Sequence, residues 1–204
     1  MSAHAVGLKT FASLADYDLV KRALAGREDG FEELVRRYQR PIVAYIYRMI
    51  GDYDGALDLT QEVFIKVYGS LDRYSREYKF STWIYRIAHN SAIDHLRRYH
   101  ATRAEKFTWE AEGDDAPYEK LLPSGAPSPE QESERAERRA EIEDVVWALP
   151  PAYRELIILR HGNDLSYEEI AEVTGLPLGT VKNRIFRARE AMRLSLVERG
   201  ITSI

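Results

Sequence analysis

Positive charge is concentrated near the C-terminal end of the chain, in residues whose types could bind DNA. From Leu178 to Arg193 the sequence holds five basic residues against the single acid Glu190. Lys and Arg neutralise backbone phosphates, and side chains on a helix in the major groove can read base edges. We predict that the DNA-contacting residues of this segment are Thr180, Lys182, Asn183, Arg184, Phe186, Arg187 and Arg189.

The residues around this segment predict a helix-turn-helix that would position it. Ser166 and Glu169 have the spacing of a capping box at the start of a short helix, and Gly175 suits a left-handed turn after it. Pro177 can occupy the first turn of the next helix. The inward stripe of that helix is Val181, Ile185, Ala188 and Met192. A second helix of this kind lies in the major groove, with its N-terminal half at the base edges.

A second basic segment, Arg73 to Arg103, holds seven basic residues against two acids and is interleaved with aromatic residues. This composition suits a groove that follows a nucleic-acid backbone and stacks unpaired bases. We expect a helix that is capped by Ser81 or Thr82 and ends near Tyr99. Its predicted buried residues are Ile84, Tyr85, Ala88, Ala92, Leu96 and Tyr99. Its opposite side collects Trp83, Arg86, Ile87, Asn90, Asp94, Arg97 and Arg98.

Trp83 and Ile87 on this basic side have two explanations. They could pack against a neighbouring helix, or they could contact unstacked bases, each of which is worth about 1 to 3 kcal/mol when it stacks on an aromatic side chain. Both explanations are open on the sequence alone.

A third predicted helix, Asp54 to Leu71, carries acids on one side. The inward stripe is Leu57, Val63, Phe64, Val67, Tyr68 and Leu71. The outward side is Asp54, Asp58, Gln61, Glu62 and Ile65. Periodicity alone favours an ordinary solvated face, whereas an exposed Ile65 among carboxylates fits a protein-docking surface better.

Composition and charge distribution predict an all-α protein of two small domains. The chain has 204 residues, of which 45% are hydrophobic and 30% charged, and its formal net charge is −4. Residues 101–135 hold nine acids, four bases and four of the eight prolines, so they cannot build a core. We expect an N-terminal tail (1–15), a helical domain (16–100), a flexible acidic linker (101–135) and a second helical domain (136–204).

Several classes of protein are excluded or disfavoured. The absence of cysteine excludes disulfides and cysteine-ligated metals within the chain. Residues 1–15 have neither a signal-peptide pattern nor a membrane-spanning run, so we expect a cytoplasmic protein without membrane insertion. The five histidines lack metal-ligand spacing, and no phosphate-binding glycine motif occurs. We therefore expect no enzyme activity, metal, cofactor or small-molecule substrate.

Three parts of the sequence together resemble one family. They are DLTQEVFIKVY from Asp58, FSTWIYRIAHN from Phe80, and LSYEEIA from Leu165 followed by GTVKNRIFRAREA from Gly179. In this order they resemble extracytoplasmic-function (ECF) sigma factors, the minimal two-domain class of the bacterial sigma-70 family. The resemblance implies a promoter-specificity subunit of RNA polymerase, with a sigma-2 and a sigma-4 domain.

The resemblance also implies a role for each surface. The outward acidic face, Asp54, Asp58, Gln61, Glu62 and Ile65, would dock on core RNA polymerase. The minus-10 promoter DNA would be melted and read by Tyr74, Tyr78, Lys79, Trp83, Arg86, Asn90, Arg97 and Arg98. The helix-turn-helix would bind the minus-35 element, and an anti-sigma factor would hold the protein inactive. Asn183 stands where many family members carry serine, so the base preference at this position does not transfer.

Two other functions are compatible with a helix-turn-helix. A one-component transcriptional regulator would need an effector pocket and a self-complementary dimer interface. Neither is identifiable in the sequence, and the second basic segment would then have no role. A module that sequesters polymerase is the other alternative, and transcription assays would distinguish it from an initiation factor.

Overall fold

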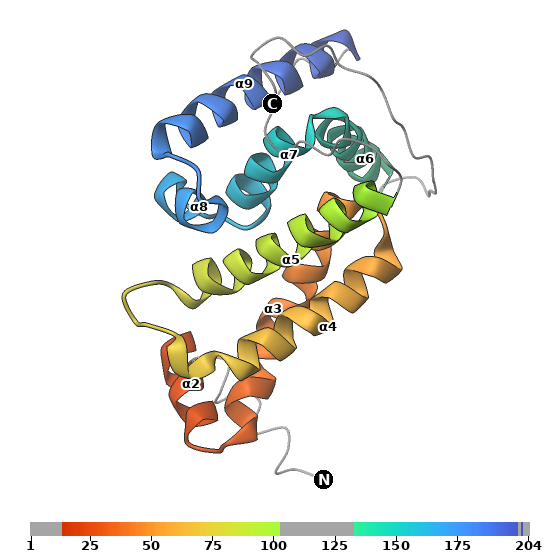
Figure 1. Cartoon of the computed structure of the whole chain (residues 1–204). Helices are drawn as coiled ribbons and strands as arrows, with labels where there is room; N and C mark the ends of the chain where they lie inside the picture. Colours follow the sequence, from red (N-terminus) through yellow and green to blue (C-terminus); the bar gives the residue numbers. More distant parts are fainter. Residues whose placement is uncertain (1–13, 103–132, 200, 202–204) are drawn as a thin grey trace. The chain divides into compact units, whose positions relative to one another are not determined.

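The chain is entirely helical wherever its structure is described. The computed structural model describes residues 14–102, 133–199 and 201, and these contain no β-strand (Figure 1). The helices divide into two compact units, built mainly of α2 to α5 and of α6 to α9. The all-α prediction is confirmed. Most of the predicted acidic linker lies outside the described residues, but α5 runs to Thr102 and α6 begins at Ser133, so both ends of that segment are helical.

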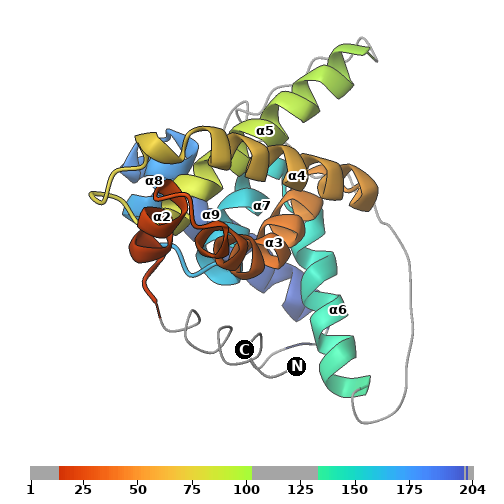
Figure 2. The same cartoon turned by 90° about the horizontal axis from the view of Figure 1, so that it is seen from below.

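The N-terminal unit is built around one long central helix. The elements are α2 (Asp16–Leu24), α3 (Glu28–Ile50), α4 (Tyr53–Gly69), the 3₁₀ turn η1 (Leu71–Arg73) and α5 (Phe80–Thr102). Helix α3 packs against α2, α4 and α5. Its apolar side is fully buried at Leu34, Ile42 and Ile46. Because α4 and α5 pack on the same helix, their outer faces are held in fixed positions on this unit (Figure 2).

A polar network joins α2 to α3. The buried Glu33 carboxylate accepts hydrogen bonds from Arg36 at 2.6 Å and from Arg37 at 2.9 Å. Arg37 also forms an ion pair of 2.6 Å with Asp16 in α2. The Arg36 hydrogen bond holds the pKa of Glu33 below its usual range, against the opposing effect of burial. The paired Glu33 thus stays ionised inside the unit.

Two predictions for α5 were wrong. The helix begins at Phe80, and the Trp83 N–H donates to the Lys79 carbonyl, so neither Ser81 nor Thr82 is the cap. Tyr99, predicted to be inward, is 45% exposed. The end of α5 extends beyond the other helices of this unit, so Tyr99 has no core of the unit to enter (Figure 2).

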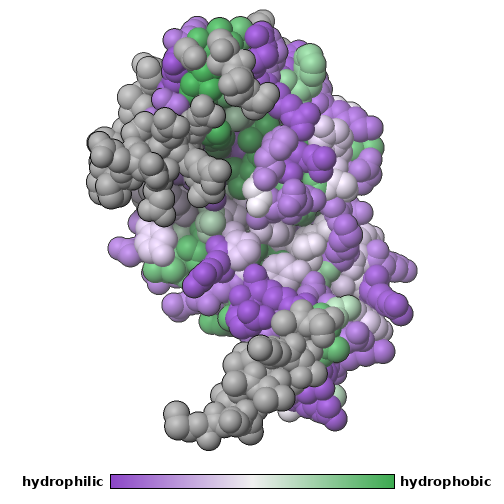
Figure 3. Space-filling view, turned by 180° about the vertical axis from the view of Figure 1, so that it is seen from behind, coloured by the Kyte–Doolittle hydropathy of each residue, from purple (hydrophilic) through white to green (hydrophobic). Residues whose placement is uncertain are grey.

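The C-terminal unit contains the predicted helix-turn-helix. Its elements are α6 (Ser133–Ala148), α7 (Pro151–Ile157), the π-helical segment η2 (Ile158–Gly162), α8 (Tyr167–Thr174) and α9 (Leu178–Glu198). Helix α9 packs against α6 and α7. Leu156, Leu159, Ile170 and Ile185 are fully buried in this core. Figure 3 shows hydrophobic residues gathered near the top of the view, in this unit, among hydrophilic ones.

Arg154 fixes the turn between α6 and α7. Its Nη2 donates to the carbonyls of Trp147 at 2.8 Å and Leu149 at 3.1 Å, and its guanidinium lies 4.6 Å from the centre of the Trp147 ring. Burial lowers the pKa of Arg154 to about 10. The cation therefore satisfies carbonyls at the end of α6, where the helix dipole also favours positive charge.

Candidate functional site

The outward side of α4 is exposed as predicted. Asp54, Asp58, Gln61 and Glu62 are all exposed, and Ile65 has 71% of its surface accessible. The opposite side is buried at Ala56, Leu59, Thr60, Val63, Phe64 and Val67. A large apolar side chain this accessible beside carboxylates makes a surface that can combine apolar contact with charge complementarity. We call Asp54, Asp58, Gln61, Glu62 and Ile65 the acidic face.

Tyr68 was predicted to be inward and is not. It is 62% exposed, and its ring meets only the edge of Phe31, with centroids 4.9 Å apart. Three residues after Ile65, it lies beside it on the same side of α4. Leu57, also predicted to be inward, is only half-buried. Tyr68 therefore extends the exposed apolar surface next to the acidic face. Helical periodicity alone had predicted an inward position for this residue.

An aromatic cluster organises the loop before α5. The Trp83 ring lies 5.5 Å from Tyr74 and 5.7 Å from Phe80, measured between centroids. The Tyr74 hydroxyl donates to the Tyr78 carbonyl at 2.9 Å, and burial raises the pKa of Tyr74. Trp83 is thus half-buried against rings of its own unit, while Tyr78 is 44% exposed. Packing within the protein, one of the two explanations offered for Trp83, therefore accounts for part of its surface.

The same loop is attached to α2. The Arg76 guanidinium lies 4.9 Å from the centre of the Tyr17 ring, and the Lys21 ammonium lies 4.7 Å from the same centre. Cation–π contacts of exposed groups are worth about 0.5 to 1 kcal/mol each. Arg76 therefore restrains the loop, and Lys79, at the start of α5, remains exposed.

The basic side of α5 faces outward along the helix. Arg86, Asn90, Arg97 and Arg98 are exposed. Asp94 is the acid within this row and lies 3.8 Å from Arg97, a loose and exposed ion pair that costs little to break. The opposite side is buried at Ile84, Tyr85, Ala88 and Ala92, whereas Leu96 is half-buried. The arginines are available to bind an anionic backbone.

The helix-turn-helix forms with the predicted caps. The Glu169 N–H donates to Ser166 Oγ at 3.2 Å, and the Ser166 N–H donates to Glu169 Oε2 at 2.7 Å. Gly175 has φ of 72°, a left-handed conformation that favours glycine. Pro177 precedes the first residue of α9 rather than entering its first turn. The capping box and the glycine turn thereby set the angle at which α9 leaves α8.

Helix α9 presents a basic outer side. It buries Val181, Ile185 and Ala188, with Met192 half-buried. Phe186 is 70% exposed on the other side. Lys182, Asn183 and Arg189 are exposed, and Thr180, Arg184 and Arg187 are half-buried. We call Thr180, Lys182, Asn183, Arg184, Phe186, Arg187 and Arg189 the basic face.

One contact of the basic face was not foreseen from the sequence. Arg189 donates to His161 Nε2 of η2, from Nε at 3.3 Å and from Nη2 at 3.1 Å. Burial and the nearby Arg189 and Arg160 lower the pKa of His161, while Asp164 acts in the opposite direction. The neutral ring can accept these hydrogen bonds. The two residues are 28 positions apart, so no local pattern signals the pair.

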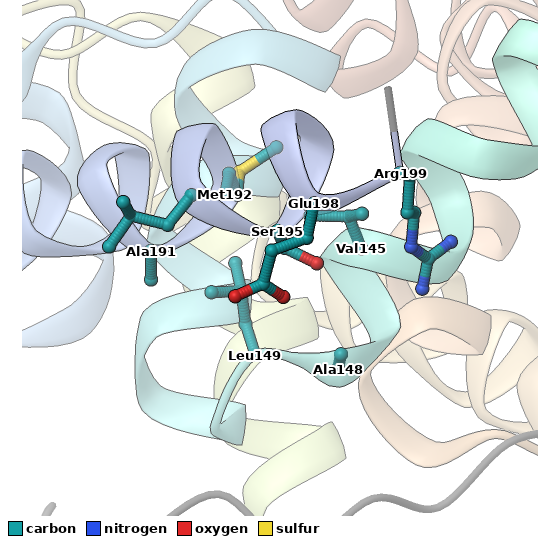
Figure 4. Close-up of a pocket in the computed structure, with 9 residues that line it drawn as sticks. Val145, Ala148, Leu149, Ala191, Met192, Ser195, Glu198 and Arg199 are labelled. Atoms are coloured by element: carbon teal, nitrogen blue, oxygen red, sulfur yellow. The ribbon is translucent and has the colours of Figure 1, made fainter. Parts of the chain in front are cut away.

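An apolar groove lies between α6 and α9. It measures about 540 Å³, and Figure 4 shows its lining side chains. Val145, Leu149 and Met192 supply apolar walls, and Glu198 and Arg199 add charged groups to the lining. Arg199 is 3.6 Å from Asp144 of α6. Within the described residues, no cluster of three or more metal-ligating side chains occurs, and no helix is both long and apolar enough to cross a membrane.

Two family models match the two units. Sigma-70 region 2 matches residues 34–102, and Sigma-70 region 4 matches residues 139–192. The class defined by fold and surfaces is therefore that of the sigma-70 transcription initiation factors.

Individual relatives narrow the class. The chain is 36% identical to ECF RNA polymerase sigma factor SigW of Bacillus subtilis over 181 residues, which cover 87% of this chain and 94% of SigW. It is 40% identical to RNA polymerase sigma-H factor of Pseudomonas aeruginosa over 190 residues, or 89% and 93% of the two chains. The chain belongs to the ECF group of the sigma-70 family and is an RNA polymerase sigma factor.

Solved structures share the fold. CnrH, in complex with the cytosolic domain of CnrY, superposes with a TM-score of 0.61 at 23% identity, covering 91% of this chain and 99% of CnrH. The sigma factor RpoE of Bartonella quintana, in complex with the anti-sigma factor NepR, gives 0.60 at 21% identity and covers 81% and 96%.

Proposed function

We propose that the acidic face docks the chain on core RNA polymerase and that the two basic surfaces then contact promoter DNA. The observation that carries this proposal is a pair of exposed hydrophobic side chains in opposite surroundings. Ile65, 71% exposed, lies among acids on α4, and Phe186, 70% exposed, lies among bases on α9. Among the described residues these are the two most exposed large hydrophobic side chains, and on α4 the exposed Tyr68 extends the apolar surface, as at protein-interaction sites.

The acidic face fits a basic protein surface. Asp58 and Glu62 are one helical turn apart, and Ile65 follows within the next turn, so all three can meet one partner helix at the same time. Ile65 and Tyr68 would lose water on docking, while the carboxylates select a partner of opposite charge. Asp54 and Gln61 complete this contact at its edge. Core RNA polymerase is the partner that a sigma factor must bind.

The loop before α5 and the basic side of α5 suit the minus-10 element. Tyr74, Tyr78 and Trp83 offer ring surface at one end of α5, and Arg86 and Asn90 continue along the same helix. Arg97 and Arg98 lie at the far end, where they can hold backbone phosphates, and Lys79 adds a cation beside the loop. Unstacked bases could bind the rings while the arginines follow the strand. We assign single-stranded minus-10 DNA to this surface.

The basic face of α9 suits duplex minus-35 DNA. Lys182, Asn183, Phe186 and Arg187 would lie nearest the bases, and Arg184 and Arg189 would contact phosphates. A recognition helix reads bases with its N-terminal half, which is where Lys182 and Asn183 lie. Thr180, at the start of α9, is placed to approach the DNA backbone.

A large partner is physically required. Opening a duplex costs about 1.4 kcal/mol of stacking for each base-pair step. Two small DNA-binding units on one chain gain effective concentration when a common platform holds both. We propose that the chain performs no catalysis, that it works in the cytoplasm with the polymerase, and that residues 16–100 and 136–204 are its two functional domains, with residues 101–135 as the link.

An anti-sigma factor is the inhibitor we propose. RpoE, which shares the fold, is in complex with an anti-sigma factor in its solved structure. Covering Ile65 and its neighbouring carboxylates would prevent docking without unfolding the chain. Inhibition would then be reversible when the inhibitor is removed.

The test is transcription of genomic DNA fragments by core polymerase, with and without the chain, followed by sequencing of transcript starts. We expect new starts that share two upstream elements. General inhibition without new starts would contradict an initiation role and support a sequestering module.

A further inference from the structure

We propose that His161 is a positioning residue for promoter binding: it holds the Arg189 guanidinium at the DNA-facing side of α9 and makes minus-35 binding weaken at acid pH. His161 lies in η2, outside the helix-turn-helix, and nothing in the α9 sequence points to it. The inference rests on the proposed contact between Arg189 and DNA phosphate.

The geometry requires a neutral imidazole. Arg189 donates twice to the same ring nitrogen, Nε2 of His161, at 3.1 and 3.3 Å. A guanidinium has donors only, so Nε2 must supply a lone pair and the ring proton must lie on Nδ1. Protonation of Nε2 removes the acceptor and places two cations in contact.

The local conformation sets the distance. The π-helical segment η2 follows α7 directly and shifts the side-chain directions at Arg160 and His161 relative to a regular helix. Arg160 is engaged by other groups: its Nη1 donates to the Leu165 carbonyl at 3.0 Å, and its guanidinium lies 5.4 Å from the centre of the Tyr167 ring. His161 is thus the residue of η2 that reaches Arg189.

The surrounding charges set the direction of the pH effect. Burial lowers the pKa of His161, and Arg189 from α9 and Arg160 from η2 lower it further, while Asp164 after η2 raises it. The ring is therefore neutral at pH 7.5. As the pH falls through this lowered pKa, which lies below the ordinary value of about 6.5, acid progressively removes the hydrogen bonds to Arg189. Without these hydrogen bonds, the Arg189 side chain samples more rotamers before binding, so it loses more entropy when it binds a phosphate.

A direct phosphate contact by His161 predicts the opposite pH dependence. An imidazolium against DNA would strengthen binding at acid pH. The sign of the pH dependence therefore separates a positioning role from a direct contact.

The experiment measures holoenzyme affinity for a labelled duplex that carries the minus-35 region of a promoter found by transcript sequencing. At pH 7.5, His161→Ala should weaken binding about two- to fivefold, since the lost hydrogen bonds are solvent-accessible. His161→Gln should retain binding, because its amide oxygen can accept from Arg189 and does not titrate. As the pH is lowered from 7.5 through the lowered pKa of His161, the wild type should lose affinity relative to His161→Gln. The comparison with this variant cancels pH effects on the polymerase.

A double-mutant cycle supplies the matched control. In an Arg189→Ala background, His161→Ala should have no further effect. In an Arg193→Ala background it should have its full effect, because Arg193 pairs with Glu190 at 2.6 Å and not with His161. A constant ratio of wild type to His161→Gln across pH, acid-strengthened binding, or additivity with Arg189→Ala would overturn the inference. If Arg189→Ala itself leaves binding unchanged, the proposed role of Arg189 fails instead.

Discussion

The outer faces of α4 and α9 are built alike and charged oppositely. Each helix buries one stripe in its own unit and carries its most exposed large hydrophobic side chain outside that stripe, Ile65 at 71% on α4 and Phe186 at 70% on α9. Acids surround the first and bases surround the second. The exposed hydrophobic side chain can bind any apolar partner, so the surrounding charges must select the partner. The acids of α4 select a basic protein surface, and the bases of α9 select a polyanion.

Charge reversal on α4 should have the largest effect. Asp58→Lys combined with Glu62→Lys places like charges against the partner, which costs several kcal/mol. We expect core-polymerase binding to weaken by at least about 100-fold, the equivalent of about 2.8 kcal/mol. Fluorescence titration of labelled chain with core enzyme measures it.

The matched control is Glu28→Lys with Glu32→Lys on α3. These acids are also exposed, four residues apart and in the same unit. Core binding should stay near the wild-type value. Equal loss in both double variants would mean that net charge, and not the acidic face, determines docking.

Glu33→Gln tests how much the buried polar network between α2 and α3 contributes to the stability of the N-terminal unit. The amide keeps one acceptor oxygen but removes the negative charge that Arg36 and Arg37 share, and we expect a loss of about 2 kcal/mol in unfolding free energy. Chemical denaturation of the chain measures it. Glu190→Gln breaks an exposed pair with Arg193 and should leave the midpoint unchanged, so equal shifts in both variants would refute the importance of burial.

The lowered pKa of Glu33 predicts that the stability of the folded chain depends on pH. The pKa of Glu33 is lowered in the folded state, so its contribution is present above its unfolded pKa and is lost as pH falls through the folded value. The difference in stability between the wild type and Glu33→Gln should therefore begin to shrink as the pH falls below about 4.3, the usual value for glutamate, and should continue to shrink toward the lowered pKa of the folded state. A difference that grows as the pH falls below about 4.3 would contradict the ionised state of Glu33.

Substitutions at the two exposed hydrophobic residues should each affect a different activity. Ile65→Ala should weaken polymerase binding about tenfold, because about 1.5 kcal/mol of apolar contact is lost. Minus-35 recognition by the assembled holoenzyme should be unchanged. Phe186→Ala should weaken minus-35 binding to a similar degree and leave polymerase binding unchanged. Both side chains are exposed, so neither change should lower the melting temperature. Loss of the same activity in both variants would contradict the comparison.

The smallest effect distinguishes phosphate contacts from base contacts within α9. Arg184→Ala should reduce the slope of log affinity against log salt by about 0.9 and weaken all sequences alike. Phe186→Ala should leave the slope unchanged and alter base preference. The measurement is a salt titration of holoenzyme on matched and mutated minus-35 duplexes. A slope change in the Phe186 variant alone would reverse these assignments.

Local signals predicted much of the fold and both helix faces. The capping box at Ser166 and the left-handed Gly175 depend on residues close in sequence, and the structure confirms both. The exposure of Asp58, Glu62 and Ile65 follows from helical periodicity alone. Each of these features depends on chemistry within a few residues.

The features that the sequence did not predict depend on distant neighbours. Tyr68 lies at the margin of its helix stripe, and whether it is buried depends on how far Phe31 of α3 covers it. Tyr99 satisfies the periodicity of α5 but lies beyond the core of its unit. The His161–Arg189 contact needs a π-helical segment and a residue 28 positions away. Periodicity assigns a side of a helix, but packing decides whether that side is covered.

The most direct test of selection by charge is a crossed measurement on one reconstituted system. Core binding and minus-35 complex formation are measured for the reversed α4 pair, Asp58→Lys/Glu62→Lys, and for a reversed α9 pair, Lys182→Glu/Arg189→Glu. We predict that the α4 pair loses core binding, while the α9 pair keeps core binding and loses the minus-35 complex. Wild-type core binding by the α4 pair, or loss of core binding by the α9 pair, would contradict the account.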